Sequence, residues 1–141
     1  ASTDTAPGVE RARIPGIILI VDDEDIVLRT TREILTSIGY RTLTATNGNE
    51  AVALFRERGN EIHLVILDMI MPGLSGEETF RELKSINPHV RAIISSGFMQ
   101  DHRMDSLTEL GVVDFMQKPF RKNELAAKVA NALRLPPPPA G

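Results

Sequence analysis

Short aliphatic runs recur along this chain, and a helical pattern of apolar residues follows each of them. Such runs are typical of strands buried on both faces, and their alternation with helices predicts a doubly wound α/β domain with a parallel sheet. The run at 41–45 alternates polar and apolar residues, which predicts an edge strand. We expect strands at 17–21, 41–45, 63–67, 90–95 and 112–117, and helices at 25–38, 49–58, 77–86, 101–110 and 121–134.

The composition limits both the size and the class of the protein. A chain of 141 residues can bury one good core but is short for two ordinary domains. No apolar stretch approaches the roughly 18 to 20 residues that cross a bilayer, so we expect a cytoplasmic protein without membrane insertion. Its 16 basic and 19 acidic residues are scattered, so direct nucleic-acid binding is not expected. The absence of cysteine excludes disulfides and thiolate metal sites.

Both ends of the chain differ in composition from its centre. Residues 1–15 are rich in small, polar, Pro and Gly residues, which is typical of a linker or a disordered segment. Residues 135–141 form a Pro-rich tail that favours the polyproline II conformation. The folded domain is therefore expected to span residues 16–134.

Polar residues follow or close four of the five apolar runs. Asp22 and Asp23 follow the first run, Asp68 the third, Ser96 the fourth and Lys118 the fifth. The carboxyl ends of parallel strands meet at one edge of a sheet, where ligands bind in folds of this class. The sequence therefore predicts a single acidic pocket.

Carboxylate oxygens suit a hard cation such as Mg²⁺, which uses one or two protein carboxylates and keeps several waters. Asp23 and Asp68 could bind such an ion directly, with Asp22 holding a metal-bound water. Adjacent acids at a strand end can also simply favour the next helix, so Asp22 and Asp23 alone would not establish a metal site.

Lys118 changes this interpretation, because three carboxylates, one ammonium and a divalent cation together come near neutrality. A phosphoryl dianion could then bind, with Ser96 and Lys118 as donors. Asp68 ends the middle strand and is the best candidate for a nucleophile that forms an aspartyl phosphate.

With these motifs in order, the chain resembles the receiver domain of two-component response regulators. The resemblance covers about residues 16–134 and implies a (βα)5 flavodoxin-like sandwich with a five-stranded parallel sheet in order 2-1-3-4-5. It also implies a cis bond between Lys118 and Pro119. The matching segments are Val21-Asp22-Asp23, Leu67-Asp68-Met69, Met71-Pro72-Gly73, Ser96-Gly97 and Lys118-Pro119-Phe120.

The resemblance implies a phospho-acceptor domain whose Mg²⁺-dependent phosphorylation shifts the face formed by helix four, strand five and helix five. Phe115 matches the family's aromatic switch position, although an ordinary core Phe would also fit there. The implied roles are Asp68 as acceptor, Asp22, Asp23, Asp68 and the Ile70 backbone carbonyl as ligands of Mg²⁺ or Mn²⁺, Ser96 as the switch hydroxyl, and Lys118 as the phosphoryl contact.

Two apolar residues flank the expected site. Ile70 lies two positions after Asp68, and Phe98 lies two positions after Ser96. Our hypothesis is that both shield the aspartyl phosphate from water and lengthen its lifetime. Glu24 and Asp25 are expected to favour the N-terminus of the first helix through its dipole, although one of them could approach the acidic site.

Other functions fit the residues less well. A phosphatase of the haloacid dehalogenase type would need a second Asp two residues after the first, where Ile70 stands. A nucleotide-binding module would need a Gly-rich loop where this chain has four acids, at 22–25. A pseudo-receiver usually lacks one of the acids or the Lys. We therefore expect no enzyme activity from this chain beyond its own phosphorylation and dephosphorylation.

The resemblance implies a histidine kinase as partner and allows a histidine phosphotransfer protein as another. The motif run is most similar to receivers attached to hybrid sensor histidine kinases, so the kinase can belong to the same parent chain. A stand-alone response regulator remains the alternative. Both a monomer and a dimer that forms on phosphorylation are compatible with the sequence.

Overall fold

The structure is a computed structural model that describes residues 16–97 and 101–134, without the side chains of 101–103. The segments 1–15 and 135–141 and the residue Phe98, on which predictions were made, lie outside the described residues. Within the described part, no helix combines the length and the apolar character that crossing a membrane requires. The helices are α2 (Asp25–Ile38), α3 (Gly48–Arg58), α4 (Gly76–Ile86), α5 (Asp101–Leu110) and α6 (Lys122–Arg134), and a short 3-10 helix, η1, spans Gly59–Glu61.

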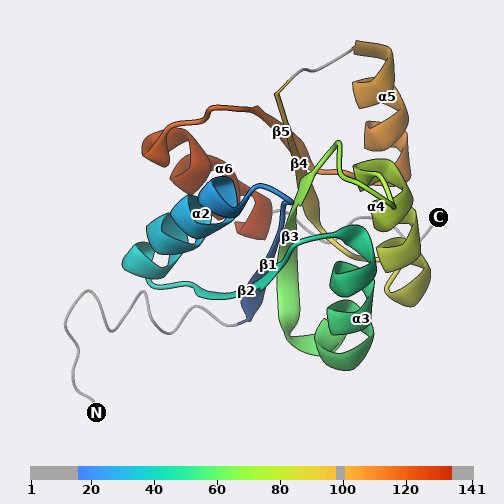
Figure 1. The fold of residues 1–141 in the computed structure, drawn as a ribbon, viewed down its shortest axis with the longest axis horizontal. Helices are drawn as coiled ribbons and strands as arrows, with labels where there is room; N and C mark the ends of the chain where they lie inside the picture. The colour runs from blue at the N-terminus through green and yellow to red at the C-terminus, as the bar shows by residue number, and fades with distance from the viewer. Residues whose placement is uncertain (1–15, 98–100, 135–141) are drawn as a thin grey trace.

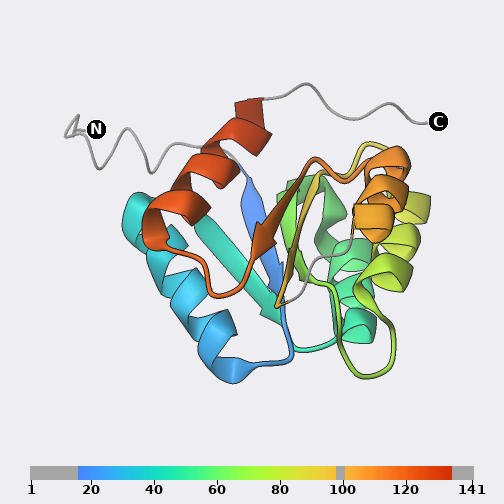
Figure 2. The same cartoon turned by 90° about the horizontal axis from the view of Figure 1, so that it is seen from above.

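Five parallel strands form one sheet in the order β2-β1-β3-β4-β5, which confirms the expected fold (Figure 1). The strands are β1 (Ile17–Val21), β2 (Arg41–Ala45), β3 (Ile62–Asp68), β4 (Ala92–Ser96) and β5 (Asp114–Gln117). Helices α2 and α6 cover one face of the sheet, and α3, α4 and α5 cover the other (Figure 2). The alternating strand β2 lies at an edge, as its pattern predicts.

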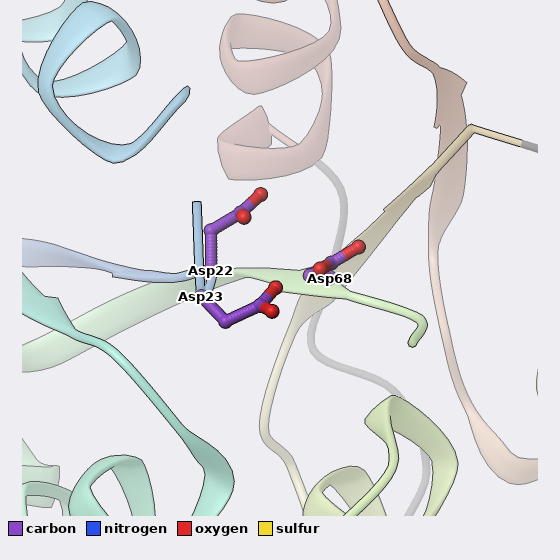
Figure 3. A group of neighbouring side chains, drawn as sticks. All are labelled: Asp22, Asp23 and Asp68. Carbon is purple, nitrogen blue, oxygen red and sulfur yellow. The ribbon is translucent and has the colours of Figure 1, made fainter. Parts of the chain in front are cut away.

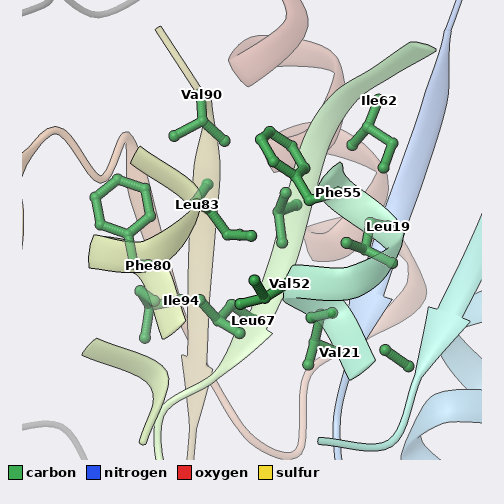
Figure 4. Close-up of a cluster of buried hydrophobic side chains, with 14 of the residues drawn as sticks. Leu19, Val21, Val52, Phe55, Ile62, Leu67, Phe80, Leu83, Val90 and Ile94 are labelled. Atoms are coloured by element: carbon green, nitrogen blue, oxygen red, sulfur yellow. The ribbon is translucent and has the colours of Figure 1, made fainter. Parts of the chain in front are cut away.

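The aliphatic runs are needed because the central strands pack against helices on both faces. In β1, Ile18 and Ile20 contact the cluster under α2 and α6, whereas Leu19 and Val21 contact the cluster under α3, α4 and α5. The second cluster also contains Phe55 of α3, Phe80 and Leu83 of α4 and Ile94 of β4 (Figure 4). Every residue of β1 is buried, so a polar residue anywhere within this strand would lie in apolar surroundings.

The two last strands begin later than predicted. The predicted strand at 90–95 begins at Ala92, and the predicted strand at 112–117 begins at Asp114. The backbone N–H of Val90 donates to the carbonyl of Asn87, and that of Val112 donates to the carbonyl of Leu107. These groups therefore close turns after α4 and α5, which leaves them unavailable to the sheet.

Helix α2 turns one face toward the sheet. Leu28, Thr31 and Leu35 are buried on this face, whereas Val27, Ile34 and Ile38 are only partly buried. The helix ends at Ile38, and the C-cap residue Gly39 has a φ of 121°, which lies in the region that favours glycine.

Candidate functional site

The three predicted carboxylates meet at the carboxyl ends of the central strands. Asp22 and Asp23 directly follow β1, Asp68 ends β3, and these strands pair up to Val21 and Leu67. One carboxylate oxygen of each residue lies within 4.8 Å of those of the other two (Figure 3). Asp22 and Asp68 are buried, and Asp23 is exposed. The structure therefore brings the three predicted carboxylates together in one cluster.

Lys118 brings a positive charge into this cluster from the end of β5. Its Nζ lies 2.8 Å from Oδ2 of Asp22 and 3.2 Å from Oδ1 of Asp68. The backbone N–H of Lys118 donates to the carbonyl of Ser96 at 2.7 Å, and the bond between Lys118 and Pro119 is cis, as the resemblance implies. Because β4 lies between β3 and β5, the long Lys side chain has to span the end of β4 to reach Asp68.

A third carboxylate also contacts the ammonium. Oε1 of Glu24 lies 3.2 Å from Nζ of Lys118, whereas Asp25 pairs with Arg29 on the surface of α2. The side chain of Lys118 is only 13% exposed, and an ammonium has three N–H donors for these three carboxylates. The sequence allowed either acid to approach the site, and the structure identifies Glu24.

Burial and neighbouring charges shift the pKa values of Asp68 and Lys118. Burial, reinforced by the negative charge of Asp22, raises the pKa of Asp68 from an ordinary value of 3.8 to about 6, although Lys118 acts in the opposite direction. Hydrogen bonds and the charges of Asp22 and Asp68 raise the pKa of Lys118, against the opposing effect of its burial. At neutral pH the site therefore holds a protonated Lys118 beside an Asp68 carboxylate that is costly to keep ionised.

Close packing of α4 fixes the backbone that carries Asp68. Ser75 and Glu78 form a capping box at the start of α4, and the N–H of Gly76 donates to the carbonyl of Met69. A Cβ atom at Gly76 would lie 2.4 Å from the backbone oxygen of Asp68. Only glycine lets the helix approach this closely, so the loop after Asp68 is held by backbone contacts.

The acidic cluster opens into a cavity of about 720 Å³ that is lined by both polar and apolar residues. Ser96 and Lys118 line it together with Asp23 and Asp68. Gly97, Pro119 and Phe120, which belong to the predicted motifs, also line the cavity. The rest of this wall comes from α2, whose residues the sequence did not predict as part of the site because only packing brings them there. They are Ile26, Val27, Thr30 and Thr31.

Three more residues, Ile70, Phe115 and Phe98, were predicted to contribute to the site. Ile70 lines the cavity with 71% of its surface exposed, so it stands at the mouth of the pocket. Phe115 is partly buried against the core on the side of α3, α4 and α5, and among the described residues it does not line this cavity. Phe98 lies outside the described residues.

The donor set fits a hard divalent cation. Asp22, Asp23 and Asp68 offer only carboxylate oxygens, and Asp23 remains open to solvent, which would let an ion keep several waters. Lys118 offsets one of the three negative charges, so the cluster remains negatively charged overall. The residues present therefore match the chemistry of Mg²⁺ or Mn²⁺.

Similarities to known proteins agree with this geometry. Sensor kinase CckA of Brucella abortus is 34% identical over 116 residues, which cover 82% of this chain and 12% of CckA. The probable transcriptional regulator ycf27 of Porphyra purpurea is 39% identical over 118 residues, covering 83% of this chain and 47% of ycf27. This chain thus spans less than half the length of either relative.

A solved structure is similar over nearly the whole described part. A chain of the CheX-CheY-BeF3-Mg²⁺ complex from Borrelia burgdorferi matches with a TM-score of 0.83 and 26% identity, and the match covers 86% of this chain and 92% of that one. A family profile described as response regulator receiver domain matches residues 18–130, a range that contains the three clustered carboxylates and Lys118. The chain therefore belongs to the response regulator receiver domain family of two-component signalling.

Proposed function

We propose that this receiver accepts a phosphoryl group on Asp68 from a histidine kinase and later loses this group by hydrolysis or by transfer to another protein. The observation that carries this proposal is the Asp68 carboxylate itself, which is buried at the end of the central strand beside Lys118 and opens into the cavity. Because Asp68 lines the cavity, a phosphorus atom that enters it could meet this carboxylate in line with its leaving group.

The proposed step exchanges one bond for another. An Asp68 carboxylate oxygen attacks the phosphorus of an N-phosphohistidine, and the new P–O bond forms as the P–N bond breaks. The imidazole leaves with the electron pair of the P–N bond and takes a proton from solvent. Because the pKa of Asp68 is about 6, its carboxylate is ionised and ready to attack at neutral pH.

The other residues position and neutralise charge. Asp22, Asp23, Asp68 and the backbone carbonyl of Ile70 would hold Mg²⁺ or Mn²⁺, and such an ion would offset the charge that develops on the phosphoryl oxygens. Lys118 would donate to a phosphoryl oxygen, since its ammonium already lies 3.2 Å from Oδ1 of Asp68.

Signalling would follow from a shift between two arrangements of the loop after β4. We assign the switch hydroxyl to Ser96, which is buried at the end of β4 and lines the cavity. Phe115 of β5 is partly buried, and we assign it the aromatic switch position. Its movement would alter the face formed by α5, β5 and α6.

The phosphoryl lifetime would depend on apolar neighbours. Ile70 stands at the mouth of the cavity and would limit the approach of water to an aspartyl phosphate. We propose the same role for Phe98 from its position in the sequence.

The relatives leave open which kind of parent protein carries this domain. One is a sensor kinase and the other a probable transcriptional regulator, and the similar region is only part of each. We propose the former, with the kinase in the same parent chain and a histidine phosphotransfer protein as a further partner, from the similarity of the motif run to receivers of hybrid kinases. The cytoplasmic location and the choice between a monomer and a phosphorylation-dependent dimer remain predictions.

The decisive experiment exposes the protein to Mg²⁺ and acetyl phosphate and follows the intact mass. One added phosphoryl group is expected on the wild type and none on Asp68→Asn. Beryllofluoride with Mg²⁺ should shift the NMR signals of the strand ends in the wild type alone. A wild type that stays unmodified and unshifted, or an Asp68→Asn variant that gains the same mass, would refute the proposal.

A further inference from the structure

Glu24 contacts the proposed phosphoryl site although it belongs to none of the motifs that define it. Its Oε1 lies as close to the Lys118 ammonium as Oδ1 of Asp68 does, at 3.2 Å in both cases. Glu24 and Lys118 are 94 positions apart in the sequence, so this contact exists only in the folded protein.

The local structure leaves the Glu24 side chain free for this contact. Glu24 is the N-cap residue of α2, yet its side chain makes no capping hydrogen bond. Short Ser, Thr, Asp or Asn side chains are usual at such a position, because they can reach back to the helix N–H groups. The backbone N–H of Glu24 donates instead to Oδ1 of Asp22 at 2.9 Å, which ties this residue to the acidic cluster.

The three partners of the ammonium would respond differently to a metal ion. Asp22 and Asp68 are members of the cluster that fits a divalent cation, and Glu24 is not. An ion in the cluster would be held by two of the three carboxylates that Lys118 now contacts, Asp22 and Asp68. Glu24 would then remain as the partner that the ion does not compete for.

A phosphoryl group on Asp68 would add a competing acceptor. The Lys118 ammonium has three N–H donors, and in the present arrangement three carboxylates accept them. A donor directed at Glu24, whose side chain is 62% exposed, points toward the solvent side of the pocket. Contact with the phosphoryl oxygens therefore requires Lys118 to give up at least part of its present set of partners.

We propose that Glu24 is a positioning residue for Lys118, which holds the ammonium when a metal ion occupies the cluster and competes with the phosphoryl group for it. This inference rests on the proposed function of Asp68. Glu24 then favours metal binding, because it gives the displaced ammonium a partner. It also weakens the hold of Lys118 on the phosphoryl group, which shortens the life of the phosphorylated state.

The test compares two variants that remove one negative charge from neighbouring positions. Glu24→Gln keeps the length of the side chain and removes the ion pair with Lys118. Asp25→Asn is the matched control, since Asp25 pairs with Arg29 at 2.7 Å on the surface of α2. Metal affinity is measured by titrating ¹⁵N-labelled protein with Mg²⁺ and following the NMR signals. Phosphoryl loss is measured by intact mass at saturating Mg²⁺ after acetyl phosphate is removed.

We expect Glu24→Gln to raise the Kd for Mg²⁺ by about twofold to fivefold, the range that a partly exposed ion pair supports. Loss of the phosphoryl group should slow by about the same factor, and Asp25→Asn should change neither value by more than about 1.5-fold. In a Lys118→Met background, the effect of Glu24→Gln on Mg²⁺ affinity should disappear, because Glu24 acts through Lys118.

Unchanged Mg²⁺ affinity and phosphoryl loss in Glu24→Gln would overturn the inference. Equal effects of Asp25→Asn, or an effect of Glu24→Gln that persists without Lys118, would overturn it as well. Both results would mean that the loss of a nearby negative charge, and not the contact with Lys118, causes the change. Failure of the proposed function gives a different result, in which the wild type gains no phosphoryl group on Asp68. The Mg²⁺ titrations still test the contact between Glu24 and Lys118 in that case.

Discussion

Replacing Asp68 by Asn should stabilise the metal-free protein, although it removes the proposed phosphoryl acceptor. The Asp68 side chain is 6% exposed and lies beside Asp22, so folding places a carboxylate where its charge is unfavourable. The Asn side chain has nearly the same shape as a neutral Asp and carries no charge. The variant therefore removes the cost of ionisation and keeps most of the packing.

The pKa of Asp68 sets the size of this effect. The folded-state value of about 6 lies above the ordinary 3.8, so the folded protein binds the proton more tightly than the unfolded chain does. Ionised Asp68 consequently lowers the free energy of unfolding by about 3 kcal/mol above pH 7, at 1.36 kcal/mol for each pH unit between the two values. The penalty shrinks as the pH falls through 6 and is absent below the unfolded-state pKa.

The assay is urea unfolding followed by circular dichroism, with EDTA present to exclude divalent cations. At pH 7.5 we expect Asp68→Asn to unfold with a free energy about 3 kcal/mol above that of the wild type, which corresponds to a Tm roughly 10 °C higher. Near pH 4 the difference should fall below about 1 kcal/mol. Saturating Mg²⁺ at pH 7.5 should narrow the gap, because the ion stabilises only the protein that retains the Asp68 carboxylate.

Asp25→Asn serves as the control, since this exposed acid should change the free energy of unfolding by less than about 0.5 kcal/mol. The reasoning would be refuted by an Asp68→Asn variant no more stable than the wild type at pH 7.5. A gain in stability that did not decrease toward pH 4 would refute it too, because the cost would then not come from ionisation.

Three further variants test other parts of the site. In urea unfolding with EDTA, Lys118→Met should lower the free energy of unfolding by about 2 kcal/mol. This is less than the roughly 3 to 5 kcal/mol typical of broken buried ion pairs, because Asp68 can take up a proton. Mg²⁺ should restore most of the lost stability, and an equal loss in its presence would contradict this. Gly76→Ala should cost about 1 to 3 kcal/mol in the same assay, since its Cβ would meet the Asp68 backbone oxygen; unchanged stability would show that α4 can move away. The double variant Ile70→Asn, Phe98→Glu should lose the phosphoryl group faster than the wild type after donor removal, as followed by intact mass, and equal decay would end the shielding hypothesis.

The sequence predicted the elements well where their signals are local. The bounds of β1 and β2 agree with the prediction, because each strand is an uninterrupted run or a clear alternation that ends at polar or turn-forming residues. The starts of β4 and β5 were predicted two residues early. Val90 and Val112 have the side chains of strand residues, but their N–H groups are bonded in turns, which side-chain patterns do not reveal.

The site was predictable for a related reason. Parallel strands present their carboxyl ends at one edge, so Asp22, Asp68 and Lys118 could be expected to meet before their distances were known. The order of the strands, in contrast, could not be worked out from the pattern of residues and was implied only by the resemblance to receivers.

Other features depend on how the elements pack. Glu24 and Asp25 are neighbours with the same charge, and only the path of the chain into α2 directs Glu24 to Lys118 and leaves Asp25 to Arg29. The cavity wall formed by Ile26 and Phe120 likewise arises from two segments far apart in the sequence.

The sequence by itself thus determined which polar residues lie together at one edge of the sheet, because apolar periodicity and strand ends are local properties. The tertiary structure alone decided how strongly these residues affect one another. The pKa of Asp68 and the three-way contact of Lys118 depend on burial and on distances of about 3 Å, and both are set by long-range packing.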